Sequence, residues 1–308
     1  MDFFTSHDWL GRSGPFTNSI EYTLYILLFV ILGAGLIVLL RLKNNPKLVK
    51  ITLIVIWAIN LGMDLLKLVA LRLKGPFNIG SDMLLYICSL FLYAMPFAIW
   101  GNEKFKNMAC TFVCTIGLFG AIMNFVVPST IIDHSLFSYL GFHTVTYHLN
   151  LILVPFIILI TRYHKIAWKD FGWAFLGFVV LTVPALFFNF MAGTDWMYLG
   201  YGADLPFPFV PALVEKIGSL WTLVAYAGYA GIQALLMVMI WGIDKLVVYI
   251  AKLIAQRKTA PVEGPAPTQA ETVKEEPAVE TPTEAKKPAT KKTTTKSTTT
   301  KTTKTTKK

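Results

Sequence analysis

The chain has 308 residues, of which 55% are hydrophobic and only 15% are charged, and its mean hydropathy is +0.56. A soluble domain usually carries about a quarter charged residues, so this composition excludes a soluble globular class and indicates a polytopic membrane protein. The net charge of +10 is unevenly spread, because ten lysines and six glutamates follow residue 258 and contribute +4 of it.

Seven apolar runs are long enough to cross a bilayer core of about 30 Å, which takes roughly 20 helical residues. They lie near 22–42, 51–71, 82–100, 106–127, 138–161, 171–191 and 221–244. We therefore predict an all-α fold, a polytopic membrane bundle of about seven transmembrane helices. The predicted parts are an extracytoplasmic N-terminal segment (1–21), the transmembrane domain (22–257) and a cytoplasmic tail (258–308).

The charges of the connecting loops predict how the bundle is oriented. Basic residues such as Arg41, Lys43 and Arg162 follow the odd-numbered runs, whereas the alternate loops carry Asp133 and Asp195. By the positive-inside rule, the N-terminus then lies outside and the C-terminus lies in the cytoplasm. An odd number of spans likewise puts the two termini on opposite sides of the membrane. We expect the protein in the cell (plasma) membrane.

The tail changes composition beyond Gln256, first to Pro/Ala/Glu-rich and then to Lys/Thr-rich sequence. Such low complexity cannot bury enough apolar surface to fold, so we predict a disordered tail. Residues 286–308 hold nine lysines and no acid, which can contact anionic lipid or RNA through charge alone. This block has no aromatic residues for base stacking, so no specific nucleic-acid partner is expected.

Polar side chains gather in the outer half of the predicted bundle. At about 1.5 Å per residue, Cys88 lies roughly 9 Å inside the third helix, and His143 and His148 lie about 8 and 15 Å inside the fifth. The same half holds Asp64, Lys67, Asn124 and Asn189. Such groups are costly in hydrocarbon and normally face the bundle interior or a wet cavity. We predict a polar pocket there, in which Asp64 and Lys67 can pair across one helix face.

Cys88 has two interpretations at this point. A lone buried thiol is usually a small apolar filler, and a buried histidine is usually an interhelical hydrogen-bond partner. If Cys88 meets a histidine, however, the imidazole can take the thiol proton and the thiolate can attack an ester carbonyl. Asn124 or Asn189 can then orient the histidine or donate to the oxyanion. Cys110 and Cys114 share a helix face without a histidine at their depth, so neither a metal site nor a cofactor is predicted.

Four sequence elements resemble a known family, the bacterial YwaF-type integral membrane proteins. LYICSL (85–90) resembles the family signature P-L-H-L-C-S-L, and HSLFSYLGFHTVTYHLNLILVPFIIL (134–159) resembles its histidine-bearing helix. NFMAGTDWMYLGYGADLP (189–206) and LVEKIGSLW (213–221) are similar to its two later elements. The resemblance spans about residues 20 to 250 and excludes the tail. Two positions differ, because Tyr86 replaces a family histidine and Asp195 replaces an asparagine.

The YwaF-type family is related to eukaryotic transmembrane protein 164, which is regarded as a phospholipid acyltransferase with a cysteine nucleophile. The resemblance therefore implies Cys88 as nucleophile and His148 as its base. The expected supporting or substrate-binding residues are His143, Asn124, Asn189, Asp64, Lys67 and Tyr86. We predict a lipid acyltransferase or acyl hydrolase, with membrane lipids as environment and substrate. The alternative is a non-enzymatic transporter, or a lipid- or solute-binding protein, that uses the same pocket.

Overall fold

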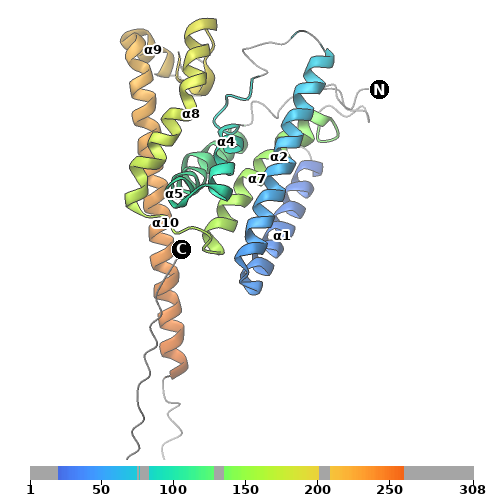
Figure 1. Cartoon of the computed structure of the whole chain (residues 1–308), viewed down its shortest axis with the longest axis vertical. Helices are drawn as coiled ribbons and strands as arrows, with labels where there is room; N and C mark the ends of the chain where they lie inside the picture. Colours follow the sequence, from blue (N-terminus) through green and yellow to red (C-terminus); the bar gives the residue numbers. More distant parts are fainter. Residues whose placement is uncertain (1–19, 75, 77–82, 128–134, 201–208, 260–308) are drawn as a thin grey trace, which may run out of the picture. The chain divides into compact units, whose positions relative to one another are not determined.

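The computed structural model describes residues 20–74, 76, 83–127, 135–200 and 209–259, and every regular element in these ranges is helical (Figure 1). The long helices are α1 (Ile20–Lys43), α2 (Pro46–Lys74), α7 (Tyr139–Ile160), α8 (Phe171–Ala192) and α10 (Trp221–Thr259). The shorter ones are α4 (Leu90–Trp100), α5 (Glu103–Phe112), α6 (Leu118–Val126) and α9 (Phe209–Ile217). Single turns are η2 (Val113–Gly117), η3 (Trp168–Asp170), η4 (Trp196–Tyr198) and η5 (Gly218–Leu220).

The predicted all-α membrane bundle is confirmed. Six helical stretches in the described part of the chain are long and apolar enough to span a membrane, and one further apolar helix is shorter. The six are Ile20–Lys43, Pro46–Arg72, Glu103–Val126, Tyr139–Ile160, Trp168–Ala192 and Phe209–Leu253, and the short helix is Leu90–Trp100. The orientation that the loop charges predict stays a prediction, and the tail beyond Thr259 lies outside the described residues.

The third predicted helix is shorter than expected. We predicted a helix over 82–100 with Cys88 two turns inside it, but α4 begins at Leu90. The N–H groups of Ser89 and Leu90 both donate to the Tyr86 carbonyl, at 2.9 and 3.2 Å, and so close a turn over 86–90. Cys88 therefore precedes the helix. The prediction was wrong here because a short apolar run indicates burial and does not distinguish a buried turn from a helix.

α7 is the most buried of the long helices, and the site depends on it. It packs against α1, α2, α6 and η2, whereas α5 packs against α4 and α8. α2 is tied to α4 as well, since the Trp57 indole donates to the Leu92 carbonyl at 3.0 Å. Ser138 begins α7 as its N-cap, with its side-chain oxygen accepting from the Gly141 N–H at 3.1 Å. α7 thus has a fixed start and presents side chains to helices on several sides.

The span over Glu103–Val126 is interrupted at its centre. α5 and α6 are joined by η2 (Val113–Gly117), a single π-helical turn whose five residues are all buried. A π-turn inserts one residue into an α-helix without breaking it. The insertion sets which way the α6 side chains face relative to those of α5.

Candidate functional site

Tyr147 on α7 connects the Cys88 turn with the two histidines of the predicted site. Its hydroxyl donates to the Cys88 carbonyl oxygen at 3.3 Å. Its ring stacks on the His143 imidazole, with centroids 5.5 Å apart and planes 21° apart. The same ring meets the His148 imidazole edge-on, at 5.5 Å and 70°. The structure therefore places Cys88, His143 and His148 around one tyrosine.

His143 forms a buried pair with Asp64 on α2. Nε2 of His143 lies 2.9 Å from Oδ1 of Asp64, and the two side chains are 5% and 4% exposed. A carboxylate only accepts hydrogen bonds, so Nε2 carries the proton and a neutral ring keeps its lone pair on Nδ1. Nδ1 of His143 and Oδ2 of Asp64 are buried and have no hydrogen-bond partner among the described residues. Asp64 forms no ion pair with Lys67 in this part of the chain, contrary to our prediction.

His148 is held by the backbone of its own helix. Its Nδ1 lies 2.7 Å from the Thr144 carbonyl oxygen, and a carbonyl can only accept, so Nδ1 is the donor. The neutral ring then keeps a lone pair on Nε2. The Phe125 ring of α6 packs edge-on against the His148 ring, with centroids 6.4 Å apart. Both histidines can therefore accept a proton, but only His143 is hydrogen-bonded to a carboxylate.

Two opposite charges act on these groups. Asp64 and the half-buried Lys67 both act electrostatically on Cys88, His143 and His148. Charges interact more strongly in a poorly solvated interior than in water. The cluster is thus a small polar region between apolar helices, with a negative charge on Asp64 and a positive charge on Lys67.

Gly120 on α6 lets the Cys88 turn approach that helix closely. A methyl group at Gly120 would overlap the Ile87 side chain and would lie 3.8 Å from the Cys88 nitrogen. Because glycine has no Cβ, the backbone of the turn lies directly against α6. Asn124 is half-buried one turn further along the same helix. α6, which packs against α7, therefore forms a second wall of the site.

Asn189 has a different role from the one predicted. Its Oδ1 accepts from the Thr194 hydroxyl at 2.9 Å and from the Trp196 N–H at 2.7 Å, and its Nδ2 donates to the Trp196 carbonyl at 3.0 Å. The amide is used to fix the turn that follows α8, so the expectation that it orients a histidine was wrong. It supports the site indirectly, since the Trp196 ring packs edge-on against Tyr86, with centroids 4.5 Å apart.

Two further amides were missed from the sequence. Nδ2 of Asn150 on α7 donates to Oδ1 of Asn60 on α2 at 2.8 Å, and both residues are buried. Asn60 precedes Asp64 by one helical turn, and Asn150 follows His143 by two, so i, i+4 and i, i+7 spacing carried the signal. Tyr147, the residue that joins the site, was missed as well, although it follows His143 by four residues and so lies on the same face of α7. No three of the described His, Cys, Asp and Glu residues lie close enough together to hold a metal ion.

A separate titratable group lies between α7 and α8, outside the membrane-spanning helices. Nε2 of His164 is 3.8 Å from Oδ2 of Asp170 and 3.4 Å from the Thr111 hydroxyl. Burial lowers the pKa of His164, and the charges of Lys106 and Lys169 lower it further, although Asp170 acts in the opposite direction. This histidine lies past the other end of α7 from the Cys88 site.

A sequence model of the TMEM164 family matches residues 15–244. The chain belongs to the TMEM164 family. The match covers all the residues of the candidate site and ends within α10, before the tail. No curated protein and no solved structure matches the chain. Together with the apolar helices, the TMEM164 match establishes a multi-pass membrane protein.

Proposed function

We propose that this TMEM164-family protein transfers or hydrolyses the acyl chain of a membrane lipid, with Cys88 as the nucleophile. The observation that supports this most directly is the contact of Tyr147 with the Cys88 backbone and with both imidazoles. A nucleophile needs a base within reach, and the base needs a group that orients it. The Asp64–His143 pair and the Thr144–His148 bond each supply such a group.

The proposed reaction has two steps. The base takes the Cys88 thiol proton, and the sulfur attacks the ester carbonyl carbon of the lipid. The bond from this carbon to the lipid oxygen then breaks, the imidazolium protonates the leaving alcohol, and an acyl thioester remains on Cys88. In the second step, the histidine takes a proton from water or from the hydroxyl of another lipid, whose oxygen attacks the thioester carbonyl carbon. The carbon–sulfur bond then breaks, the acyl group stays on the attacking oxygen, and the imidazolium returns the proton to the Cys88 sulfur. Water gives hydrolysis and a lipid hydroxyl gives acyl transfer.

The base is either of two histidines. The family resemblance implies His148, whereas the local contacts favour His143, because the Asp64 carboxylate stabilises the imidazolium that forms on proton transfer. Asn124, on the α6 wall, is the proposed oxyanion donor. We also propose that the site faces the outer leaflet of the cell membrane, on the basis of the loop charges.

Capture of the thioester tests this proposal. The purified full-length protein is placed in vesicles with a phospholipid that carries a fluorescent acyl chain, and the protein-bound label is measured before and after hydroxylamine. We expect a hydroxylamine-sensitive adduct in the wild type and in Cys110→Ala, the matched control at a buried thiol on α5. We expect none in Cys88→Ala. Lipid turnover at the wild-type rate in a folded Cys88→Ala protein would show that the proposal is wrong.

The alternative of a non-enzymatic binding protein is supported by a different observation. Oδ2 of Asp64 and Nδ1 of His143 are buried without a partner among the described residues, as expected of a pocket that receives a polar solute. In this case Asp64→Ala abolishes solute or lipid binding, while Cys88→Ala leaves it unchanged. Binding isotherms of these two variants distinguish the alternative from catalysis.

A further inference from the structure

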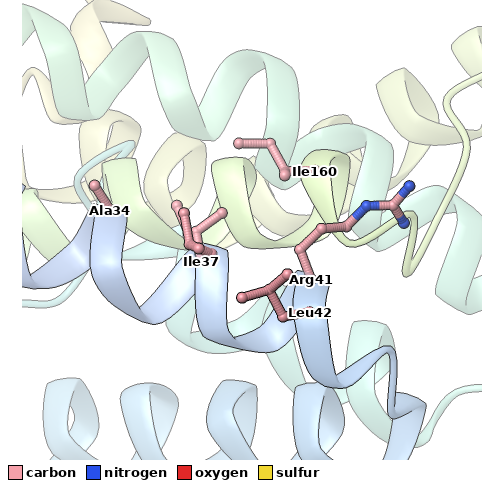
Figure 2. Close-up of a pocket in the computed structure, with 6 residues that line it drawn as sticks. Ala34, Ile37, Arg41, Leu42 and Ile160 are labelled. Carbon is pink, nitrogen blue, oxygen red and sulfur yellow. The ribbon is translucent and has the colours of Figure 1, made fainter.

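A groove of about 320 Å³ lies between α1 and the end of α7 (Figure 2). Its lining residues are Ala34, Ile37, Val38, Arg41, Leu42 and Ile160. All of them except Arg41 are apolar. From Tyr147 to Ile160 is thirteen residues along α7, or about 20 Å, so the groove is separate from the candidate active site.

The groove follows from side-chain size and spacing on α1. Ala34, Ile37 and Arg41 recur every three to four residues and so lie on one side of the helix, the side that faces Ile160 in Figure 2. Just before them, α1 lies close against α7, since a Cβ at Gly33 would be 3.1 Å from Leu153. Ala34 contributes only a methyl group, which leaves space at this end. The other end is occupied by the Arg41 guanidinium.

Arg41 supplies a positive charge that the described part of the chain does not neutralise. The ion pairs there are His143–Asp64, His164–Asp170 and Arg162–Asp244. Arg162, close to the groove in sequence, is thus already paired, whereas Arg41 has no carboxylate partner among these residues. Lys43 and Lys47 follow Arg41 and carry more positive charge. An apolar groove that ends at a guanidinium matches an amphiphile with an anionic head.

We propose that this groove binds an anionic phospholipid, with one acyl chain along the apolar wall and the phosphate on Arg41. A guanidinium binds phosphate oxygens through two parallel hydrogen bonds, and basic pockets between transmembrane helices bind such headgroups. The site is independent of the proposed reaction at Cys88. Its role is to fix α1 against α7 through a bound lipid.

Native mass spectrometry of the full-length protein in detergent tests the proposal, with phosphatidylglycerol as the anionic probe and phosphatidylcholine as the zwitterionic one. We expect the wild type to prefer phosphatidylglycerol. Arg41→Gln should weaken phosphatidylglycerol binding about tenfold and remove the preference, because a charge-assisted bidentate contact is lost. The phosphatidylglycerol affinity of Arg41→Lys should lie between those of the wild type and Arg41→Gln, because lysine keeps the charge but lacks the planar guanidinium.

Two further variants distinguish lipid binding in the groove from non-specific attraction of an anionic lipid to positive charge. Lys245→Gln removes the same charge at an exposed position next to Asp244, the partner of Arg162, and should bind phosphatidylglycerol as the wild type does. Ala34→Phe fills the groove and should weaken binding without any change in charge. Equal losses in Arg41→Gln and Lys245→Gln, or no loss in Arg41→Gln, would overturn the proposal. Equally strong binding of water-soluble glycerol 3-phosphate would also overturn it, since the acyl chain would then be unnecessary.

Discussion

Asp64→Asn is the sharpest test of which histidine acts as the base. The change keeps the shape of the side chain and one oxygen that can accept from Nε2 of His143, at the present 2.9 Å. It removes only the negative charge. If His143 is the base, the imidazolium formed in the reaction loses the carboxylate that stabilises it. If His148 is the base, its own partner is the Thr144 carbonyl, which this substitution does not alter.

The expected loss of rate follows from the strength of this contact. A hydrogen bond to a charged group contributes about 1.5–3 kcal/mol and a neutral one about 0.5–1.5 kcal/mol, so the change costs roughly 1–1.5 kcal/mol. At about 1.36 kcal/mol per factor of ten, the rate falls at least about 5- to 13-fold. If the amide instead turns its NH₂ group toward Nε2, the ring must switch tautomer and Nδ1 loses its lone pair. In Ser–His–Asp triads the wrong histidine tautomer lowers kcat about 10⁴-fold, which sets the upper limit for the loss of rate here.

The assay is the initial rate of acyl-adduct formation in vesicles at saturating labelled lipid, so that kcat is measured apart from lipid binding. Asp170→Asn is the matched control, because it is the same substitution at a buried aspartate beyond the other end of α7. It should leave the rate unchanged. A rate for Asp64→Asn within twofold of both the wild type and this control would refute His143 as the base and leave His148→Gln as the next variant to test.

Three further predictions concern stability, two of them at the site and one at His164, beyond the other end of α7. Tyr147→Phe keeps the ring contacts but removes the hydrogen bond to the Cys88 turn, so we expect a loss of about 0.5–1.5 kcal/mol of stability by thermal unfolding and a slower reaction. Gly120→Ala forces the turn away from α6 and should cost about 1–3 kcal/mol. Gly35→Ala, with open space around it inside α1, should lose no stability in the same assay, because alanine has the higher helix propensity. Burial lowers the pKa of His164 in the folded protein below its value of about 6.5 in the unfolded chain. As the pH falls, the unfolded chain therefore binds the proton first, so the stability of the fold is full above about pH 6.5 and decreases below it. Melting temperature should therefore fall from pH 7.5 to 5.5, and less steeply in His164→Gln.

The sequence was sufficient for six of the seven predicted spans but only partly for the third span and for the site. Apolar runs of about 20 residues specify spanning helices whatever their neighbours are, and depth along a helix follows from counting residues. Depth placed Cys88, Asp64 and both histidines in the same half of the predicted bundle. It does not say which way a side chain faces, because that depends on how the helices pack. Asp64 thus seemed to pair with Lys67, three residues away, and instead pairs with His143, 79 residues away.

Asn189 shows the same difficulty in another form. Its depth matched that of the site, but its amide is bonded to residues five and seven positions later in the chain. Nothing in the apolar pattern distinguishes an amide that faces a pocket from one that closes the adjacent turn. The position of Cys88 before α4 was hidden for a similar reason, since the residues of this turn are as apolar as those of the helix that follows.

The π-helical turn at Val113–Gly117 lets one span hold an extra residue while its two halves keep their alignment. If the same residues formed a regular α-helix, everything beyond the turn would be rotated by about 100°. Gly120 would then no longer lie against the Cys88 turn, although the span would be as long and as apolar as before. Deleting one residue within the π-turn should therefore preserve the site, whereas deleting one from the regular part of α5 should misalign it.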